Sequence, residues 1–457
     1  MSQSNTPRTS FVRTEMVGAE PAPASEVGVV GWMRHHLFSS IPNTILTIFA
    51  IYLVWVIVPP LLDFALFSAV WSGENREACT TLVQGGVQLD GWAGACWPYI
   101  GDYISQFIYG RYPFDQIWRV NLVFFLFVVG LVPILIPSVP YKRENAIYLF
   151  GAFPVLAFIL LSGGNIDLNG FLLPDSVMAP GFAKFIVDFL ILTAVFCLIG
   201  YGVARGTDSP PMPMMRGIAM GFAILLVVIL LFGADFGLET VETEQWGGLL
   251  VTLVIAVTGI TASLPIGIVL ALGRRSQMPA VRLFSVIFIE FWRGVPLITV
   301  LFMSSVMLPL FLPEGVTFDK LLRALIGVAL FSAAYMAEVV RGGIQALPKG
   351  QYEGAMALGL SYWQMMQFII LPQALKLVIP GIVNSFIALF KDTTLVLIIG
   401  LFDFLGMIQS SYSDSTWASP VQSLTGYLFA ALVYWLFCFS MSRYSLFMEK
   451  RLDTSRR

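Results

Sequence analysis

Residues 337–395 read AEVVRGGIQALPKGQYEGAMALGLSYWQMMQFIILPQALKLVIPGIVNSFIALFKDTTL, and this stretch decides how the chain is organised. Two long apolar runs enclose a weakly charged amphipathic segment that glycine and proline interrupt more than once. A plain hairpin between two membrane spans needs only a few polar residues there, whereas this chain uses roughly thirty. A structured element of this size at the membrane surface is typical of a contact with another protein.

The composition predicts an all-α, polytopic membrane protein. The 457 residues are 57% hydrophobic and 12% charged, with a mean hydropathy of +0.80, whereas soluble domains carry about 25% charged residues. Apolar runs able to cross a hydrocarbon core of roughly 30 Å recur along the whole chain. The formal net charge of −2 gives no indication of a nucleic-acid partner.

We predict about ten transmembrane helices, with the Pro59-Pro60 pair either kinking the first of them or ending it. Residues 1–40 are expected to form a cytoplasmic, disordered tail, because the first thirty are polar and rich in Ser, Pro and Thr. A division near residue 240 separates an N-terminal extension with five spans, 41–240, from a core, 241–457. The approximate span cores are 41–64, 120–140, 146–162, 185–204, 217–236, 248–272, 283–303, 324–340, 377–400 and 423–441.

Lysine and arginine concentrate in alternate connections and in the C-terminal tail, which predicts that both termini lie in the cytoplasm. The segment 71–117 then lies outside, in the periplasm. It holds Cys79 and Cys96, which would form a disulfide in an oxidising compartment. Two unpaired thiols are the alternative.

The connection 346–373 contains glycine and proline residues at positions that predict where helices end and begin. The Gly342-Gly343 pair is expected to loosen the end of the eighth span, and Pro348 prevents the helix from simply continuing. Residues 351–358 can then form a short helix, which Gly359 is placed to close in a left-handed conformation.

A second helix of the connection is expected to begin at Ser361, because Gln364 three residues later completes a capping box. It would run toward Pro372 along the inner membrane face. A plain interfacial hairpin is the alternative to a surface that docks a partner. Five large side chains are expected either to pack against lipid or core or to face that partner: Met356, Trp363, Met365, Met366 and Phe368.

The connection resembles the cytoplasmic EAA loop of ABC-importer permeases. Their pattern is E-A-A, three residues, G, nine residues, then I-x-L-P, and every spacing fits. Glycine stands where the pattern has its first alanine, and glycine weakens a helix by up to about 1 kcal/mol relative to alanine. The matching residues are Glu353, Gly354, Ala355, Gly359, Ile369, Leu371 and Pro372.

Flanking sequences narrow the resemblance to the polar amino-acid branch of these permeases, over roughly residues 245–450. The long extension is similar to that of a permease subunit of the general L-amino-acid importers of Gram-negative bacteria. The sequences that carry the branch resemblance are FWRGVPL (291–297), AEVVRGG (337–343), LPKGQ (347–351) and KDTTL (391–395).

The resemblance implies a permease subunit of an ATP-driven importer in the bacterial inner membrane, moving amino acids from periplasm to cytoplasm. A second permease subunit, by family layout a sister chain, would complete the pathway. Two cytoplasmic ATPases would bind the loops, and a periplasmic binding protein would deliver the amino acid. ATP and Mg²⁺ would act on the ATPase, and no cofactor is expected on this chain.

Charged and polar residues inside the membrane are candidates for pathway or gating roles, because burying them in lipid is costly. The two Glu/Arg pairs are three residues apart and can each neutralise locally; the alternative is that they pair between helices and hold the bundle together. The polar stripe of the ninth span could complement the ammonium and carboxylate of an amino acid. The candidates are Glu290, Arg293, Glu338, Arg341, Asn384, Ser385, Lys391 and Asp392.

The sequence disfavours covalent chemistry on this chain. It has no Gly-Lys dipeptide and hence no P-loop, and its only histidines, His35 and His36, exclude an HExxH metal site. We expect neither catalytic nor metal-binding residues.

An ion-coupled secondary transporter is the alternative function, but it would often show repeats that are not visible here. An intramembrane hydrolase would commonly carry a Gly-x-Ser-x-Gly elbow, which is also lacking.

Overall fold

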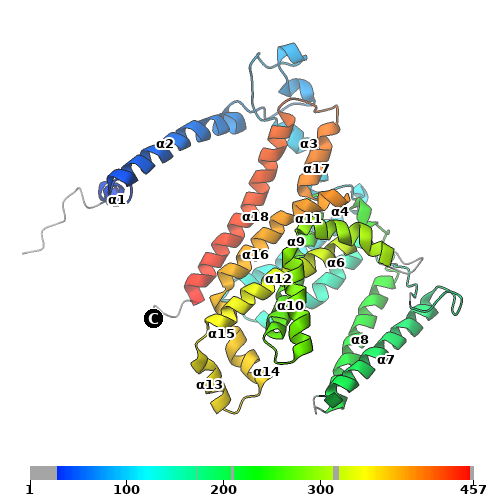
Figure 1. Ribbon diagram of the computed structural model, residues 1–457. Coiled ribbons are helices and arrows are strands. Elements are labelled where there is room, and N and C mark those ends of the chain that lie inside the picture. The colour runs from blue at the N-terminus through cyan, green and yellow to red at the C-terminus, as the bar shows by residue number, and fades with distance from the viewer. Residues whose placement is uncertain (1–27, 171, 207–209, 312–318, 453–457) are drawn as a thin grey trace, which may run out of the picture. The chain divides into compact units, whose positions relative to one another are not determined.

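Figure 1 shows the computed structural model, which describes residues 28–170, 172–206, 210–311 and 319–452. Most of the expected N-terminal tail, residues 1–27, lies outside the described residues. The chain forms two compact units. Of the described residues, one unit comprises 28–70 together with 91–95, and the other comprises 71–90 and those from 96 onward.

The first unit is helical from residue 28, so the predicted disordered tail is wrong for its last part. Basic residues occupy the last turn of its first helix, where positive charge is favourable, and the Trp32 ring stacks on His36 at 5.1 Å. Pro59 and Pro60 lie inside the second helix and do not end it. The elements are α1 (Gly28–His36), α2 (Ile41–Leu62) and a π-helical turn, Asp63–Phe67.

The second unit contains the remaining helices. Those before residue 240 are α3 (Trp97–Tyr109), α4 (Ile117–Leu135), α5 (Lys142–Ile147), α6 (Phe153–Ser162), α7 (Phe182–Gly206) and α8 (Pro211–Gly233). Those after it are α9 (Gly248–Arg274), α10 (Pro279–Gly294), α11 (Leu297–Phe302), α12 (Lys320–Ala346), α13 (Lys349–Ala357), α14 (Tyr362–Met365), α15 (Leu371–Leu377), α16 (Ile379–Asp392), α17 (Phe404–Ser410) and α18 (Gln422–Leu452). In Figure 1, α7 and α8 lie side by side as a hairpin.

Nine helical segments of the described residues are long and apolar enough to cross a membrane, and a tenth candidate is broken. The predicted seventh span, 283–303, is not straight, because α10 meets the helical stretch Leu297–Phe311 at 104°. Val295 is extended at the break, with ψ 134°. Pro296 explains this, since proline disfavours a helical conformation in the residue before it and lacks an N–H.

Contacts between the connections show that the broken helix crosses the membrane once. Thr243, before α9, donates a hydrogen bond to the carboxylate of Asp319, before α12. Arg275, after α9, donates to the hydroxyl of Tyr352, after α12, at 3.1 Å. Residues that touch outside the membrane are separated by an even number of crossings. Each pair encloses one straight candidate span and the broken helix, so the broken helix counts as a tenth candidate crossing of the described residues, in agreement with the prediction of about ten.

The segment 71–117 packs on the C-terminal part of the chain. Helix α3 contacts α9, α17 and α18. A disulfide joins Cys79 and Cys96. The Cys96 amide donates to Thr425 Oγ1 at 3.0 Å, and the Tyr99 hydroxyl lies 2.5 Å from Ser411 Oγ. The division near residue 240 stays a prediction, but this part of the extension is attached to the core.

The core of the C-terminal part lies between α9 and α12, the most extensive helix pair. Apolar residues of the connection 346–373 continue this core, including Ala355 and Ile370. The cluster lies at the ends of α9 and α12 that adjoin the connection, with Leu270, Met336 and Ile344 among its members. The connection is therefore fixed to the two helices by burial of apolar surface.

Gly342 and Gly343 do not loosen α12, which continues to Ala346. A Cβ atom on Gly343 would lie 2.6 Å from the backbone oxygen of Ala374 in α15. A Cβ atom on Gly342 would meet no atom within 4 Å. Gly343 therefore serves close helix packing, and the expectation from sequence was wrong because glycine's flexibility matters less here than its missing side chain.

We predict that Gly343→Ala lowers the free energy of unfolding by about 1–3 kcal/mol, because the added methyl group overpacks α12 against the backbone of α15. Gly342→Ala is the matched control and should be neutral or slightly stabilising. The melting temperature of the purified, detergent-solubilised chain measures both. Equal melting temperatures for the two variants would contradict the packing role of Gly343.

Candidate functional site

The connection 346–373 is a short helix, a turn and a second helix. Pro348 stands at the N-terminal cap of α13. Gly359 adopts the left-handed conformation expected of it, with φ +71°. Ser361 and Gln364 form the expected capping box, with the Ser361 amide 3.0 Å from Gln364 Oε1. A π-helical turn, Met366–Ile370, then links α14 to α15. The signals at Pro348, Gly359 and Ser361 therefore each have their element in the structure.

One face of this connection is buried against the membrane helices. Ala355 is 1% exposed, and Met365, Met366 and Ile370 are buried with it. The Tyr352 hydroxyl donates to the backbone oxygen of Ile344 at 3.1 Å. A movement of α13 must therefore move the end of α12.

The opposite face of the connection is open. Glu353 and Gly354 are exposed, and Leu358 is 76% exposed at the turn. Met356 and Trp363 are also exposed. Burial thus divides the methionines, since Met356 faces outward whereas Met365 and Met366 belong to the core. No atom lies within 4 Å of a Cβ built on Gly354, so glycine at this position is not required by packing.

The end of the connection borders an apolar groove. Pro372 is exposed and lines the groove, and Leu371 is half-buried there. The groove has a volume of about 420 Å³, and Leu272 of α9 and Trp363 of α14 contribute to it. Ile369 is half-buried, and its backbone oxygen accepts a hydrogen bond from Gln373. The residues that match the EAA-loop pattern thus include both a buried anchor and an exposed surface.

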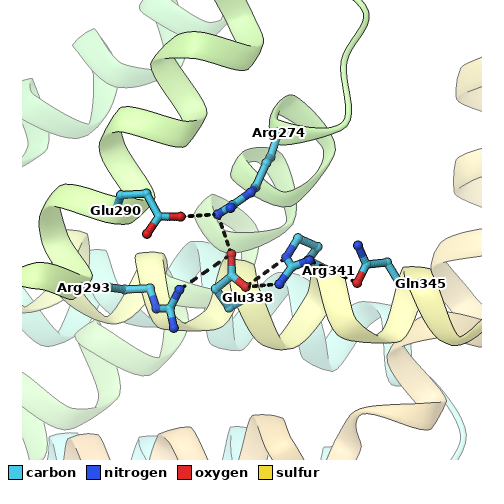
Figure 2. A network of polar contacts seen from close by, with 6 residues as sticks. All are labelled: Arg274, Glu290, Arg293, Glu338, Arg341 and Gln345. Carbon is cyan, nitrogen blue, oxygen red and sulfur yellow. Dashed lines mark hydrogen bonds and ion pairs between the residues drawn. The ribbon is translucent and has the colours of Figure 1, made fainter.

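Three membrane helices meet at the carboxylate of Glu338, which is 16% exposed (Figure 2). Arg274, the last residue of α9, places Nη1 2.7 Å from Glu338 Oε1. Arg341 places Nη2 2.5 Å from Glu338 Oε2 and donates through Nε at 2.9 Å. Arg293 of α10 lies farther away, at 3.9 Å. Both oxygens of the Glu338 carboxylate therefore accept hydrogen bonds from arginine side chains.

The second expected local pair does not form. Glu290 is paired with Nη1 of Arg274 at 2.9 Å, not with Arg293. Arg274 is thus shared by α10 and α12, and the network extends along α12 where Arg341 donates to Gln345 at 3.1 Å (Figure 2). Arg274 is not among the site residues predicted from sequence, because a basic residue in a connection is expected to be solvated. Its position at the end of a span, within reach of two acids, was the available signal.

The polar stripe of the ninth predicted span lies mainly on α16. Asn384 and Lys391 are exposed, seven residues apart. The Ser385 hydroxyl donates to the Gly381 oxygen of its own helix at 3.0 Å. Asp392 is half-buried, and among the described residues neither Lys391 nor Asp392 forms an ion pair. The stripe therefore remains available to a group outside this chain.

A buried carboxylate outside the candidate set organises the opposite end of the core. Asp403 caps α17 by accepting from the amides of Leu405 and Gly406, and the Tyr434 hydroxyl of α18 donates to it at 3.1 Å. Burial raises the pKa of the Asp403 carboxyl. An aspartate before a helix is a capping signal that the sequence shows, whereas the hydrogen bond from Tyr434 of α18 could not be read from the sequence.

Within the described part of the chain, no group of three His, Cys, Asp or Glu side chains is arranged to hold a metal ion. The polar residues brought together are arginines, carboxylates and amides, joined by ion pairs and hydrogen bonds. This arrangement can fix helices to one another and can bind a partner surface.

The known proteins that this chain resembles are membrane components of transport systems. A family model described as "Binding-protein-dependent transport system inner membrane component" matches residues 263–454. The inner membrane amino-acid ABC transporter permease protein YhdY of Escherichia coli (strain K12) is 47% identical over 438 residues, which are 95% of this chain and 97% of that protein. The glutamate/glutamine/aspartate/asparagine transport system permease protein BztC of Rhodobacter capsulatus is 44% identical, with 98% and 99% covered. The glutamate/aspartate import permease protein GltK of Escherichia coli O6:H1 is 33% identical over 45% of this chain and 91% of its own length.

We predict that Glu338→Gln lowers the free energy of unfolding by about 1.5–3 kcal/mol, because hydrogen bonds to charged partners are lost and two arginines keep no counter-ion at that oxygen pair. Glu290→Gln is the control, since Glu290 is 55% exposed and its one ion pair among the described residues is with Arg274. It should cost less than about 1 kcal/mol. Thermal unfolding of the purified chain provides the comparison, and an equal loss in both variants would refute the central role of Glu338.

Proposed function

The chain belongs to the family of amino-acid ABC transporter permeases, and from that premise we propose how its surfaces carry out import. It is a membrane-spanning permease subunit of an ATP-driven importer that moves amino acids into the cytoplasm, a function that its relatives favour over ion-coupled transport. The subunit itself performs no covalent chemistry. The observation that carries the proposal is the connection 346–373, which is anchored on one face and open on the other.

The open face of α13 is the contact for a cytoplasmic ATPase dimer. Glu353, Met356 and Leu358 offer one charge and two apolar groups that the chain itself leaves uncovered. ATP with Mg²⁺ is bound and hydrolysed on that partner. Closure of the ATPases would displace α13, and the buried Ala355 and Ile370 would transmit the displacement to α9 and α12. The Glu338 network makes α9, α10 and α12 move together.

The connection 346–373 lies in the cytoplasm, and segment 71–117 lies on the opposite side of the inner membrane. An even number of crossings is consistent with both termini on one side, and the basic C-terminal tail favours the cytoplasm. The disulfide between Cys79 and Cys96 supports an oxidising location for segment 71–117.

The exposed stripe of α16 faces the pathway, which a second permease subunit completes, in the family layout a sister chain. Lys391 would attract a substrate carboxylate, and Asn384 offers both a donor and an acceptor. A periplasmic binding protein delivers the amino acid. The first substrates to test are glutamate, glutamine, aspartate and asparagine, because the name of BztC contains them.

We predict that Glu353→Lys weakens the contact with the ATPase, because it reverses the charge on the open face of α13. Glu144→Lys is the control, on an exposed acid of α5 distant in sequence from the connection. Co-purification of the ATPase with the solubilised permease should fall at least several-fold for Glu353→Lys only. Unchanged recovery would remove the docking role from Glu353.

Energy coupling provides the test of the function as a whole. In proteoliposomes that contain both permeases and the ATPase, uptake of the four amino acids should require the binding protein outside and ATP with Mg²⁺ inside. It should persist when an ionophore removes the proton gradient. Uptake that needs no ATP and collapses with the gradient would establish the ion-coupled alternative.

A further inference from the structure

A second pocket lies where the segment after the first span meets the connection between α17 and α18. It has a volume of about 550 Å³ and opens to solvent. Trp71, Glu74, Pro98, Asp102 and Trp417 line it. None of these residues belongs to the connection 346–373, the Glu338 network or the stripe of α16, so import as described above leaves this pocket without a role.

Two tryptophans, Trp71 and Trp417, line this pocket. Trp417 is 2% exposed, and its Nε1 donates to Asp102 Oδ2 at 2.8 Å, which fixes both side chains. Trp71 is 61% exposed and stacks on the ring of Trp97, with centroids 5.7 Å apart and planes at 20°. Tryptophan faces attract cations more strongly than other aromatic rings do.

The pocket and its surroundings are strongly acidic. Glu74 and Asp102 are exposed at its rim, and among the described residues neither forms an ion pair with lysine or arginine. Residues 71–110 and 411–421 together contain five acids and a single base, Arg76. A field of one sign in a concave site raises the local concentration of oppositely charged groups.

The pocket is also rigidly built. The disulfide between Cys79 and Cys96 ties the chain that follows Glu74 to the N-terminal cap of α3, the helix that carries Asp102. The Arg76 amide donates to the backbone oxygen of Thr416 at 2.9 Å, and the Tyr103 hydroxyl donates to the Asp414 carboxylate. Because its walls are held by covalent and hydrogen bonds, little ordering is needed when a ligand enters.

We propose that this pocket receives a lysine or arginine side chain of the protein that delivers the amino acid. The aromatic wall and the two carboxylates suit an ammonium or guanidinium group. A free amino acid fits less well, because its own carboxylate would lie beside Glu74 and Asp102 with only Arg76 nearby in sequence to offset the repulsion. A metal ion is also disfavoured, since tryptophan supplies no ligand and two carboxylates are a sparse set. This proposal rests on the proposed function, in which segment 71–117, and with it the pocket, lies on the extracytoplasmic face.

The test measures the affinity of the complete transporter for its own substrate-binding protein, by biolayer interferometry with the transporter in lipid nanodiscs. Glu74→Gln combined with Trp71→Leu should raise Kd at least tenfold and reduce its dependence on salt concentration. Glu77→Gln, an exposed acid of the same segment that does not line the pocket, is the control for loss of charge alone and should raise Kd much less than the double variant does. Because Trp71 and Glu74 are exposed, both variants are expected to fold, which their melting temperatures verify.

Competition with small molecules identifies the group that enters. N-acetyl-lysine N-methylamide at millimolar concentration should displace the binding protein from the wild-type transporter, whereas N-acetyl-norleucine N-methylamide should not. Equal Kd values for wild type and the double variant would overturn the proposal, and so would displacement by free norleucine, which would assign the pocket to a zwitterionic substrate. If the wild-type transporter shows no ATP-dependent uptake, the proposed function fails instead. Normal uptake with an unaltered Kd in the double variant refutes the pocket alone.

Discussion

Arg274 connects the end of α9 to α10 and α12 through a single guanidinium nitrogen, which lies 2.9 Å from Glu290 and 2.7 Å from Glu338. In a lipid environment, helices gain little from apolar contact with one another, since the surrounding chains are equally apolar. A shared ion pair therefore specifies the depth and rotation of three helices at once. The position of the connection 346–373 depends on it, because that connection is packed on the adjacent ends of α9 and α12.

Rigid attachment of the connection 346–373 suits the energy-coupling role that we propose for it. Tyr352 is bonded to Ile344 on one side and to Arg275 on the other, and Gly343 lets α15 approach α12 to the distance of backbone contact. A force on α13 is thus received by two helices and not absorbed by a flexible loop. The exposed Leu358 and Met356 form a small apolar area at its tip, which is the kind of surface that a partner covers.

The opposite end of the molecule uses different interactions for the same purpose. Asp403, Tyr434 and Thr252 join α17, α18 and α9 by hydrogen bonds, and the disulfide-linked segment with α3 covers that end. The paired connections on both sides of the membrane also fix the topology. A hydrogen bond between Thr243 and Asp319 requires the helix broken at Pro296 to cross, although its 104° bend conceals a span from any criterion of straight length.

Sequence alone determined the elements that depend on near neighbours. Apolar run length gave ten crossings, and caps within four residues gave α13, the left-handed Gly359 and the Ser361–Gln364 box. Tertiary structure decided which residues meet across helices. Glu290 could pair with Arg293 by spacing, yet it pairs with Arg274, and Met365 is buried whereas Met356 is exposed. The physical reason is range: helix formation and capping act over one turn, whereas ion pairing and burial depend on how helices distant in sequence are rotated and set in depth against each other.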